Sequence, residues 1–510
     1  MGQTPVLMLG LDAADADVVD RLMTEGRLPN LRKLMQDGVS GRLSSPAGRY
    51  AGAVWPTFYT GRDVPWHGIF HNKLWRPDAM RVEVANRHWI GSRPLWESLA
   101  DSPLRLCLID VPMVLGRPEP LNGVHLSGWG THDVLSKGAW PTDLWRQLAE
   151  RHGAPIMPPE EFGAQSARSL VQMSKTLGQA TAQLRDIAID LLKREPWQLA
   201  CVVFGATHRA GHYLWDLSQV DDIDGADATV LAAALADVYA SVDAAIGAIL
   251  QSLGRETLII AFAVHGMGPN PGWSDLLPDM LAQLEVARGG EVPKTGLLYA
   301  LKQRLPFHWV RPVLRRLPLA VTDRLVPLWS ARMFDWSRTP YFPMPMDEAG
   351  YLRINLRGRE SAGIVNLGDD YDALCDSLEQ LLLSLRDADT GVPLATEIHH
   401  AYRDAAPEAP FRHLLPDLVV PWNGPPASRT RQVVSSRLPR FRYQVAKGLP
   451  SGRSGNHTDR AWFIADGPGV GQGRLKTQYS VMDLLPTALQ YLGLATACGQ
   501  GVAIDLSRSE

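Results

Sequence analysis

The chain has 510 residues, of which 45% are hydrophobic and 21% are charged, and its formal net charge is −3. This length and apolar content are enough for a large buried core, in one large domain or in two smaller ones. The nearly balanced charge gives no electrostatic reason to expect nucleic acid as a partner. No apolar stretch reaches about 18 residues, so we expect no membrane span.

Cysteine usage and the amino-terminal residues both predict a cytoplasmic protein. The four cysteines, Cys107, Cys201, Cys375 and Cys498, are widely spaced and form no CxxC pair. Such spacing favours buried free thiols in a reducing compartment. The first residues lack a basic region and reach Asp12 too soon for a signal peptide.

In chain order, apolar runs that resemble buried strands alternate with stretches of helical periodicity. The strand candidates are residues 6–11, 104–110, 199–204 and 257–263. The helix candidates are residues 16–35, broken at Leu28-Pro29, then residues 166–193 and 227–253. This alternation predicts a mostly parallel sheet that is covered by helices on both faces.

Three of the predicted strands end next to a residue that can bind a metal or move a proton. Asp12 follows the first, His208 the third and His265 the fourth. Open α/β sheets bind their ligands at the carboxyl ends of strands. His212 and His457 add two further imidazoles, and histidine with aspartate is a common ligand set for zinc. Ligands so far apart in sequence must come together in a large fold.

Residues 270–345 interrupt the alternation and are predicted to form a helical insertion. The stretch 300–316 within it is basic and contains Pro306 and Pro312, which prevent one continuous helix. It can be a surface insertion with solvated charges, a lid over the site, or a surface for an anionic membrane or a partner.

A series of short motifs runs through nearly the whole chain in a fixed order. They are Leu9-Gly-Leu-Asp12, Gly26-Arg-Leu-Pro29-Asn30-Leu31, Trp55-Pro-Thr-Phe-Tyr-Thr60-Gly61, His67-Gly68, His208–His212, His265-Gly-Met-Gly268, Asn355-Leu-Arg-Gly-Arg-Glu360, Gly455-Asn-His457, Ala465-Asp-Gly-Pro-Gly469 and Asp483-Leu-Leu-Pro-Thr487. In this order they resemble the type I phosphodiesterase/nucleotide pyrophosphatase branch of the alkaline phosphatase superfamily. The resemblance implies a three-layer α/β sandwich with a mostly parallel central sheet, in a single domain over residues 1–510.

The resemblance also implies a two-metal displacement, in which a Thr or Ser alkoxide on one metal attacks phosphorus. By that pattern, Asp12 and His265 belong to one metal site, and His212 and His457 belong to the other. Hydrolysis or transfer of a phosphoryl-type ester of a small anionic molecule is the activity it implies.

Three positions differ from the family pattern. Ala51 stands nine residues before Thr60, where the family has its nucleophile, while His208 and Val264 replace two aspartates. One site therefore keeps only Asp12 and His265 of its four usual ligands. The other becomes a three-histidine set, His208, His212 and His457, which is typical of a catalytic zinc with one open position. We expect one zinc per chain, with a second divalent metal at the weaker site as an alternative.

The altered site raises the question of which groups carry the chemistry. Asp12 and His265 are candidates for catalytic roles without a metal, although Asp12 can also be an ordinary helix cap. Arg49 and Tyr50, next to Ala51, are candidates for anion binding and for acid/base catalysis. Both can equally be ordinary loop residues.

The sequence favours a metal-dependent hydrolase or transferase. Two alternatives stay open: a metalloenzyme of the same fold doing non-phosphoryl chemistry on a small anionic metabolite, and an inactive binding or scaffold protein with a structural metal. His132 and Asp133, in a turn-rich loop, are further candidates for contact with a substrate.

Overall fold

The computed structural model describes twelve stretches of the chain. They are residues 4–89, 93–99, 102–131, 137–158, 163, 165–218, 220–253, 256–289, 334–346, 348–445, 451–494 and 499–507. The expectations for His132 and Asp133, for Cys498 and for the basic stretch 300–316 therefore lie outside the described residues. Cys107, Cys201 and Cys375 are free and buried, as expected.

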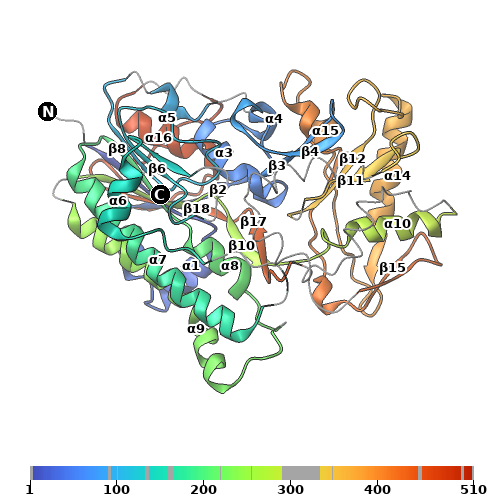
Figure 1. Ribbon diagram of the computed structural model, residues 1–510, viewed down its shortest axis with the longest axis horizontal. Helices are drawn as coiled ribbons and strands as arrows, with labels where there is room; N and C mark the ends of the chain where they lie inside the picture. The colour runs from blue at the N-terminus through green and yellow to red at the C-terminus, as the bar shows by residue number, and fades with distance from the viewer. Residues whose placement is uncertain are drawn as a thin grey trace.

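The larger lobe is built on a sheet of ten strands (Figure 1). In spatial order these are β19 (Gly473–Arg474), β2 (Val39–Ser44), β18 (Ala461–Asp466), β9 (Leu258–Ala263), β1 (Val6–Leu11), β8 (Leu199–Phe204), β5 (Leu106–Ile109), β6 (Gly123–Ser127) and β7 (Gly138–Trp140), with β20 (Tyr479–Ser480) beside β2. Only β18 and β7 run against the others. The predicted fold class, a mostly parallel sheet in an α/β sandwich, is confirmed.

Both faces of this sheet are buried, because successive side chains of a strand point to opposite faces. In β1, Leu7 and Leu9 belong to one core, and Val6 and Met8 belong to the other. The first core is covered by α1 (Ala16–Thr24), α2 (Pro29–Asp37), α6 (Leu144–His152), α7 (Ala167–Arg194), α8 (Ala206–Leu214) and α9 (Gly225–Ser252). The second is covered by α3 (Val54–Thr60), α5 (Leu95–Ser98) and α16 (Leu484–Tyr491). Two cores explain why the central strands are continuous apolar runs.

The helix predictions agree with the structure to within a few residues. The predicted break at Pro29 separates α1 from α2, and Pro29 occupies the first turn of α2, where its missing N–H is harmless. Among the described helices, only α9 is long and apolar enough to span a membrane, and half of its most apolar stretch is buried inside the fold. A core helix meets the same criteria, so α9 is weak evidence for a span.

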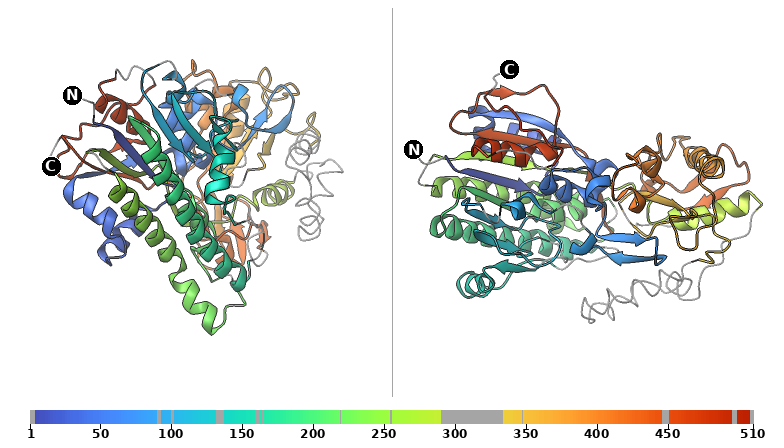
Figure 2. Two further views of the ribbon diagram at one scale, coloured as in Figure 1. Left: turned by 60° about the vertical axis from the view of Figure 1, so that its left-hand side comes forward. Right: turned by 90° about the horizontal axis from the view of Figure 1, so that it is seen from above.

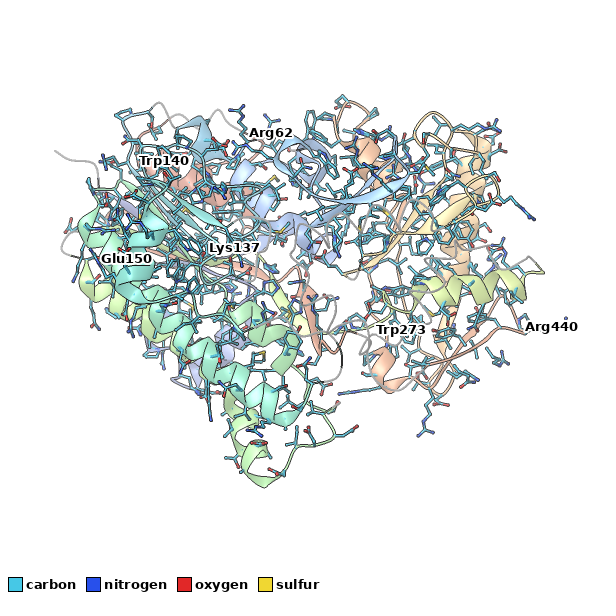
Figure 3. The ribbon with its side chains drawn as sticks, in the orientation of Figure 1. Arg62, Lys137, Trp140, Glu150, Trp273 and Arg440 are labelled. Carbon is cyan, nitrogen blue, oxygen red and sulfur yellow. The ribbon has the colours of Figure 1, made fainter. Side chains whose placement is uncertain are left out.

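A smaller lobe lies beside the larger one (Figure 2). It contains the strands β11 (Tyr341–Pro343), β12 (Gly350–Ile354), β14 (Leu418–Val420), β13 (Leu385–Asp387), β15 (Gln432–Ser435) and β16 (Arg442–Gln444), and the helices α10 (Leu277–Ala287), α14 (Asp369–Leu383) and α15 (Ala401–Asp404). Its core is separate and includes the fully buried Trp273, labelled in Figure 3. Of the predicted insertion, α10 is helical, and the lobe continues well past residue 345.

An apolar cluster joins the two lobes. Tyr50 and Ala53 of the larger lobe pack with Phe342 and Tyr351 of the smaller one, near the short hairpin of β3 (Lys73–Arg76) and β4 (Arg81–Val84). This cluster fixes the edge of the smaller lobe against the segment that contains Ala51.

The motif from Asn355 to Glu360 has a structural role in the smaller lobe. Arg353 donates to Glu360 at 2.6 Å, and Arg359 donates to Asp417 at 2.7 Å. All four side chains are nearly or fully buried. Buried charges persist when they are paired in this way.

Candidate metal centre

The predicted site residues converge at the carboxyl ends of three adjacent strands, β9, β1 and β8. Asp12 directly follows β1, and His265 lies between β9 and β10 (Gly266–Pro269). His208 and His212 are on α8, which begins two residues after β8. His457 is on β17 (Gly455–Thr458), which pairs antiparallel with β10. In Figure 1, α8 and the β10–β17 ribbon lie where the two lobes meet.

Helix α8 and the β10–β17 ribbon pack too closely for side chains larger than hydrogen at two positions. A Cβ atom at Gly455 would lie 2.0 Å from the carbonyl oxygen of Gly211, and one at Gly211 would lie 2.8 Å from Met267. This approach brings His457 against the face of α8 that carries both histidines. A spacing of four residues places His208 and His212 on that same face.

A continuous chain of close polar contacts runs through the site. The fully buried carboxylate of Asp12 accepts from Trp55 Nε1 at 2.9 Å, and its other oxygen lies 2.7 Å from His208 Nδ1. His208 Nε2 lies 2.9 Å from His212 Nε2, and His212 Nδ1 donates to the carbonyl oxygen of Gly455 at 2.9 Å. Both imidazoles are thus held by their Nδ1 atoms, with their Nε2 atoms facing each other.

His457 and His265 complete the cluster. The ring centroid of His457 lies 4.9 Å from that of His208, and 4.8 Å from those of His212 and His265. Ligand atoms of His208, His212 and His457 all lie within 4.8 Å of one another. His265 Nε2 is 3.8 Å from Asp12 Oδ1, and its buried Nδ1 has no hydrogen-bond partner among the described residues.

Burial sets the protonation state of these imidazoles. It lowers the pKa of His208, His212 and His265, because an imidazolium is poorly solvated away from water. Arg453 lowers the pKa of His208 and His212 further, and Arg209 contributes at His208. Neutral imidazoles bind metal ions, and the nearby guanidinium charges favour an anionic ligand.

The structure does not bring Arg49 and Tyr50 into this cluster. Arg49 is exposed, and it faces the smaller lobe, where burial first and the Arg49 charge second lower the pKa of His399. Tyr50 stacks on Tyr351 and packs edge-on against Phe70, and burial raises the pKa of its hydroxyl. A raised phenol pKa disfavours proton transfer near neutral pH. Their catalytic roles stay predictions, without support from these contacts.

Val264 and Ala51, the two apolar residues at positions where the family has polar ones, lie in an apolar core and beside a small cavity. Val264 is fully buried in the second core, and its carbonyl oxygen accepts from Ser45 Oγ at 2.6 Å. Ala51 lines a small cavity that His457 also lines. Neither side chain can donate an electron pair to a metal or to phosphorus.

Four residues at or beside the site were not assigned roles from sequence. Trp55 donates a hydrogen bond to Asp12. The charges of Arg209 and Arg453 lower the pKa of His208 further than burial alone. Glu348 lines the cavity that His457 also lines. Trp55 and Arg209 lie inside recognised motifs, so those motifs contained the signal. Glu348 comes from the smaller lobe, between β11 and β12, where no motif marks it.

A mostly parallel sheet that gathers four histidines and a carboxylate at its carboxyl edge defines an α/β enzyme architecture with a candidate metal centre. The profile of the type I phosphodiesterase/nucleotide pyrophosphatase family matches residues 6–414, and the chain belongs to this family of the alkaline phosphatase superfamily. Its members are hydrolases that act on phosphoryl esters and depend on divalent metals. The expected enzyme class is confirmed.

Solved structures with the same fold share little sequence with this chain. An inactive variant of murine ectonucleotide pyrophosphatase/phosphodiesterase 5 in complex with AMP is 12% identical, with a TM-score of 0.50 over 98% of this chain and 97% of that one. Phosphonoacetate hydrolase from Sinorhizobium meliloti 1021, in complex with phosphonoformate, is 13% identical, with a TM-score of 0.51 over 96% of each chain. Identity this low supports the fold alone. No curated protein sequence matches the chain.

Proposed function

We propose that the chain is a hydrolase of small anionic phosphoryl esters that holds one zinc ion on His208, His212 and His457. Because Ala51 stands at the position of the family nucleophile, hydrolysis proceeds by direct attack of water, without a phosphorylated side chain. The small anions held by two solved relatives, AMP and phosphonoformate, support this substrate class.

The facing Nε2 atoms of His208 and His212 are the observation that carries the proposal. The carbonyl oxygen of Gly455 can only accept, so His212 Nδ1 bears the proton. His208 Nδ1 faces a carboxylate oxygen of Asp12 at 2.7 Å, which is the arrangement in which a histidine donates its Nδ1 proton to a carboxylate. Two neutral rings in these tautomers point lone pairs at each other across 2.9 Å. A cation held between the rings removes this repulsion, so the residues fit a metal.

Each residue of the site then has a defined task. Asp12 fixes the tautomer and orientation of His208, as carboxylates do behind metal-binding histidines. The guanidinium groups of Arg209 and Arg453 attract the anionic substrate. Burial lowers the pKa of His265, and its Nδ1 has no hydrogen-bond partner within the described part of the chain, so this ring can hold or accept a proton beside the substrate. Zinc in a three-histidine set supplies a Lewis acid with one open position.

Metal analysis and a hydrolysis assay test the proposal together. The purified chain should retain one equivalent of zinc after dialysis, and should hydrolyse a chromogenic phosphodiester or phosphomonoester slowly. Two tightly held equivalents would show that Asp12 and His265 still form a second metal site. A trapped phosphorylated side chain would contradict direct attack by water.

An inactive binding protein is the second candidate, and Ala51 with Val264 is the observation in its favour. A structural zinc has no ligand position for water, whereas a catalytic one keeps such a position. Replacing zinc with cobalt(II) and adding phosphate distinguishes the two. The visible spectrum shifts if an anion enters the coordination sphere, and is unchanged if all positions are filled by protein.

A further inference from the structure

Arg460 joins two segments that carry residues of the candidate metal centre. It lies three residues after His457, between β17 and β18. Its Nε atom donates to Asp15 Oδ2 at 2.7 Å, and its Nη2 atom donates to the carbonyl oxygen of Met267 at 2.8 Å. The guanidinium therefore bridges the loop that follows β1 and the β10–β17 ribbon.

Asp15 is the anchor on the loop, three residues after Asp12. Its side chain is only 1% exposed, and its two oxygens bind different partners. Oδ1 accepts from the backbone N–H groups of Asp17 and Val18 in the first turn of α1, whereas Oδ2 accepts from Arg460. One buried carboxylate thus ties the start of α1 to the ribbon.

Met267 is the anchor on the ribbon, and it pairs directly with His457 across the two strands. The ribbon packs closely against the loop at this point. A Cβ atom at the neighbouring Gly266 would lie 2.5 Å from Asp15 Oδ2 and 2.7 Å from Thr458 Oγ1. A displacement of the loop therefore displaces the strand pair that carries His457.

The backbone between Asp12 and Asp15 needs restraint from outside the loop. Ala13 has a φ of 56°, in the left-handed region that a residue with a Cβ atom adopts only at a cost. Such a conformation persists where the surrounding contacts over-determine it. Asp12 directly precedes Ala13, so the direction of its carboxylate toward His208 depends on this turn.

We infer that Arg460 is a positioning residue of the metal centre, an inference that rests on the proposed zinc site. A guanidinium has its donors in a fixed fork, so the two hydrogen bonds set the separation between the loop of Asp12, which orients His208, and the strand of His457. The fork keeps these two imidazoles at the spacing that one ion requires. The Arg460 side chain is 39% exposed, so its loss should loosen the centre without unfolding the chain.

Chelator competition measures the zinc affinity of Arg460→Gln and of the unaltered chain. Loss of a group that orients a metal ligand weakens metal affinity by about 10- to 100-fold. Arg460 acts through the loop and the strand, so we expect the lower end, about a tenfold rise in the dissociation constant. Arg460→Lys should recover only part of this loss, because an ammonium is a point charge without the planar fork.

Arg42→Gln is the matched control. The Arg42 side chain is 33% exposed and donates to Asp20 of α1 at 2.8 Å, and its ion pairs within the described part of the chain are all with α1. It should bind zinc as tightly as the unaltered chain. Equal zinc affinity in Arg460→Gln and in this control would show that the fork does not set the site.

The visible spectrum of the cobalt-saturated protein separates positioning from a loss of overall stability. At saturation every molecule holds the ion, so a change in the bands reports a change in ligand geometry. We expect a changed spectrum in Arg460→Gln and an unchanged one in Arg42→Gln. An unchanged spectrum in Arg460→Gln would overturn the inference whatever its zinc affinity. If the unaltered chain binds no zinc, the proposed function fails and the positioning role fails with it.

Asp15→Asn tests the same contact from its other side. Asparagine caps a helix as well as aspartate does, so α1 should still begin at its present residue. Combined with Arg460→Gln, it should weaken zinc binding no more than the more harmful single change, because both remove one contact. A combined loss equal to the product of the two single losses would contradict a shared action of Asp15 and Arg460.

Discussion

Replacing Asp12 by Asn tests how the three-histidine site is held. Asp12 accepts a hydrogen bond on each carboxylate oxygen. One comes from Trp55 Nε1 at 2.9 Å and the other from His208 Nδ1 at 2.7 Å. Asparagine has one acceptor oxygen and one NH₂ donor, so one of these two donors must lose its acceptor. Either orientation of the amide therefore carries a defined cost.

The two orientations differ in what they damage. If the NH₂ group faces His208, the proton of that ring must move to Nε2, where it blocks metal binding. If the NH₂ group faces Trp55, the buried indole N–H is left unpaired, at a cost of about 1–3 kcal/mol. Loss of a carboxylate behind a metal-binding histidine typically weakens metal affinity by about 10- to 100-fold. We therefore expect Asp12→Asn to bind zinc about 10- to 100-fold more weakly and to unfold at a lower temperature.

Competition with a chromophoric chelator measures the zinc affinity, and thermal unfolding of the metal-free protein measures the stability. Asp243→Asn is the matched control, because Asp243 is a buried carboxylate that accepts from Asn30 and Leu31 away from the histidines. It should lower stability without affecting zinc. Unchanged affinity in Asp12→Asn would refute the orienting role. Loss of zinc as complete as in His208→Ala would make Asp12 a direct ligand.

Two further predictions concern pH and the missing nucleophile. Burial lowers the pKa of His67 to about 3 and that of His125 to about 4, so the folded state disfavours their protonation. As the pH falls below about 6.5, each histidine should reduce the free energy of unfolding by about 1.4 kcal/mol per pH unit until its folded pKa is reached. Chemical unfolding between pH 7 and 5 measures this dependence, and the free energy of unfolding should change less steeply with pH in His125→Gln than in the unaltered chain. An equal slope in the two proteins would contradict this prediction. Ala51→Thr combined with Val264→Asp should hydrolyse a chromogenic diester faster than either single variant, because an alkoxide needs the second metal that the carboxylate would help to hold. In the metal-free state Val264→Asp should unfold at a lower temperature than the unaltered chain, since it buries a carboxylate in an apolar core. Equal rates of diester hydrolysis in the single and double variants would show that position 264 does not hold metal.

The sequence by itself determined the architecture and most residues of the candidate metal site. In an apolar run such as Val6–Leu11, alternate side chains pack into different cores, which requires a central strand in a sheet that is covered on both faces. The α/β class therefore followed from local pattern. His208, His212 and His457 were found because they stand at fixed places in ordered motifs. The differences from the family pattern at Ala51 and Val264 were visible for the same reason, because the surrounding motifs show which residue the family has at each of these positions.

Only the tertiary structure decided how these residues act. The sequence left Asp12 between metal ligand and helix cap, whereas the fold ties both of its oxygens to Trp55 and His208. It suggested Tyr50 as an acid/base, and the fold packs that ring against Tyr351 between the lobes. Glu348 carries no signal in sequence because it is about 300 residues from Ala51 and belongs to another lobe. Direction and distance between side chains depend on how distant segments pack, and no local pattern encodes them.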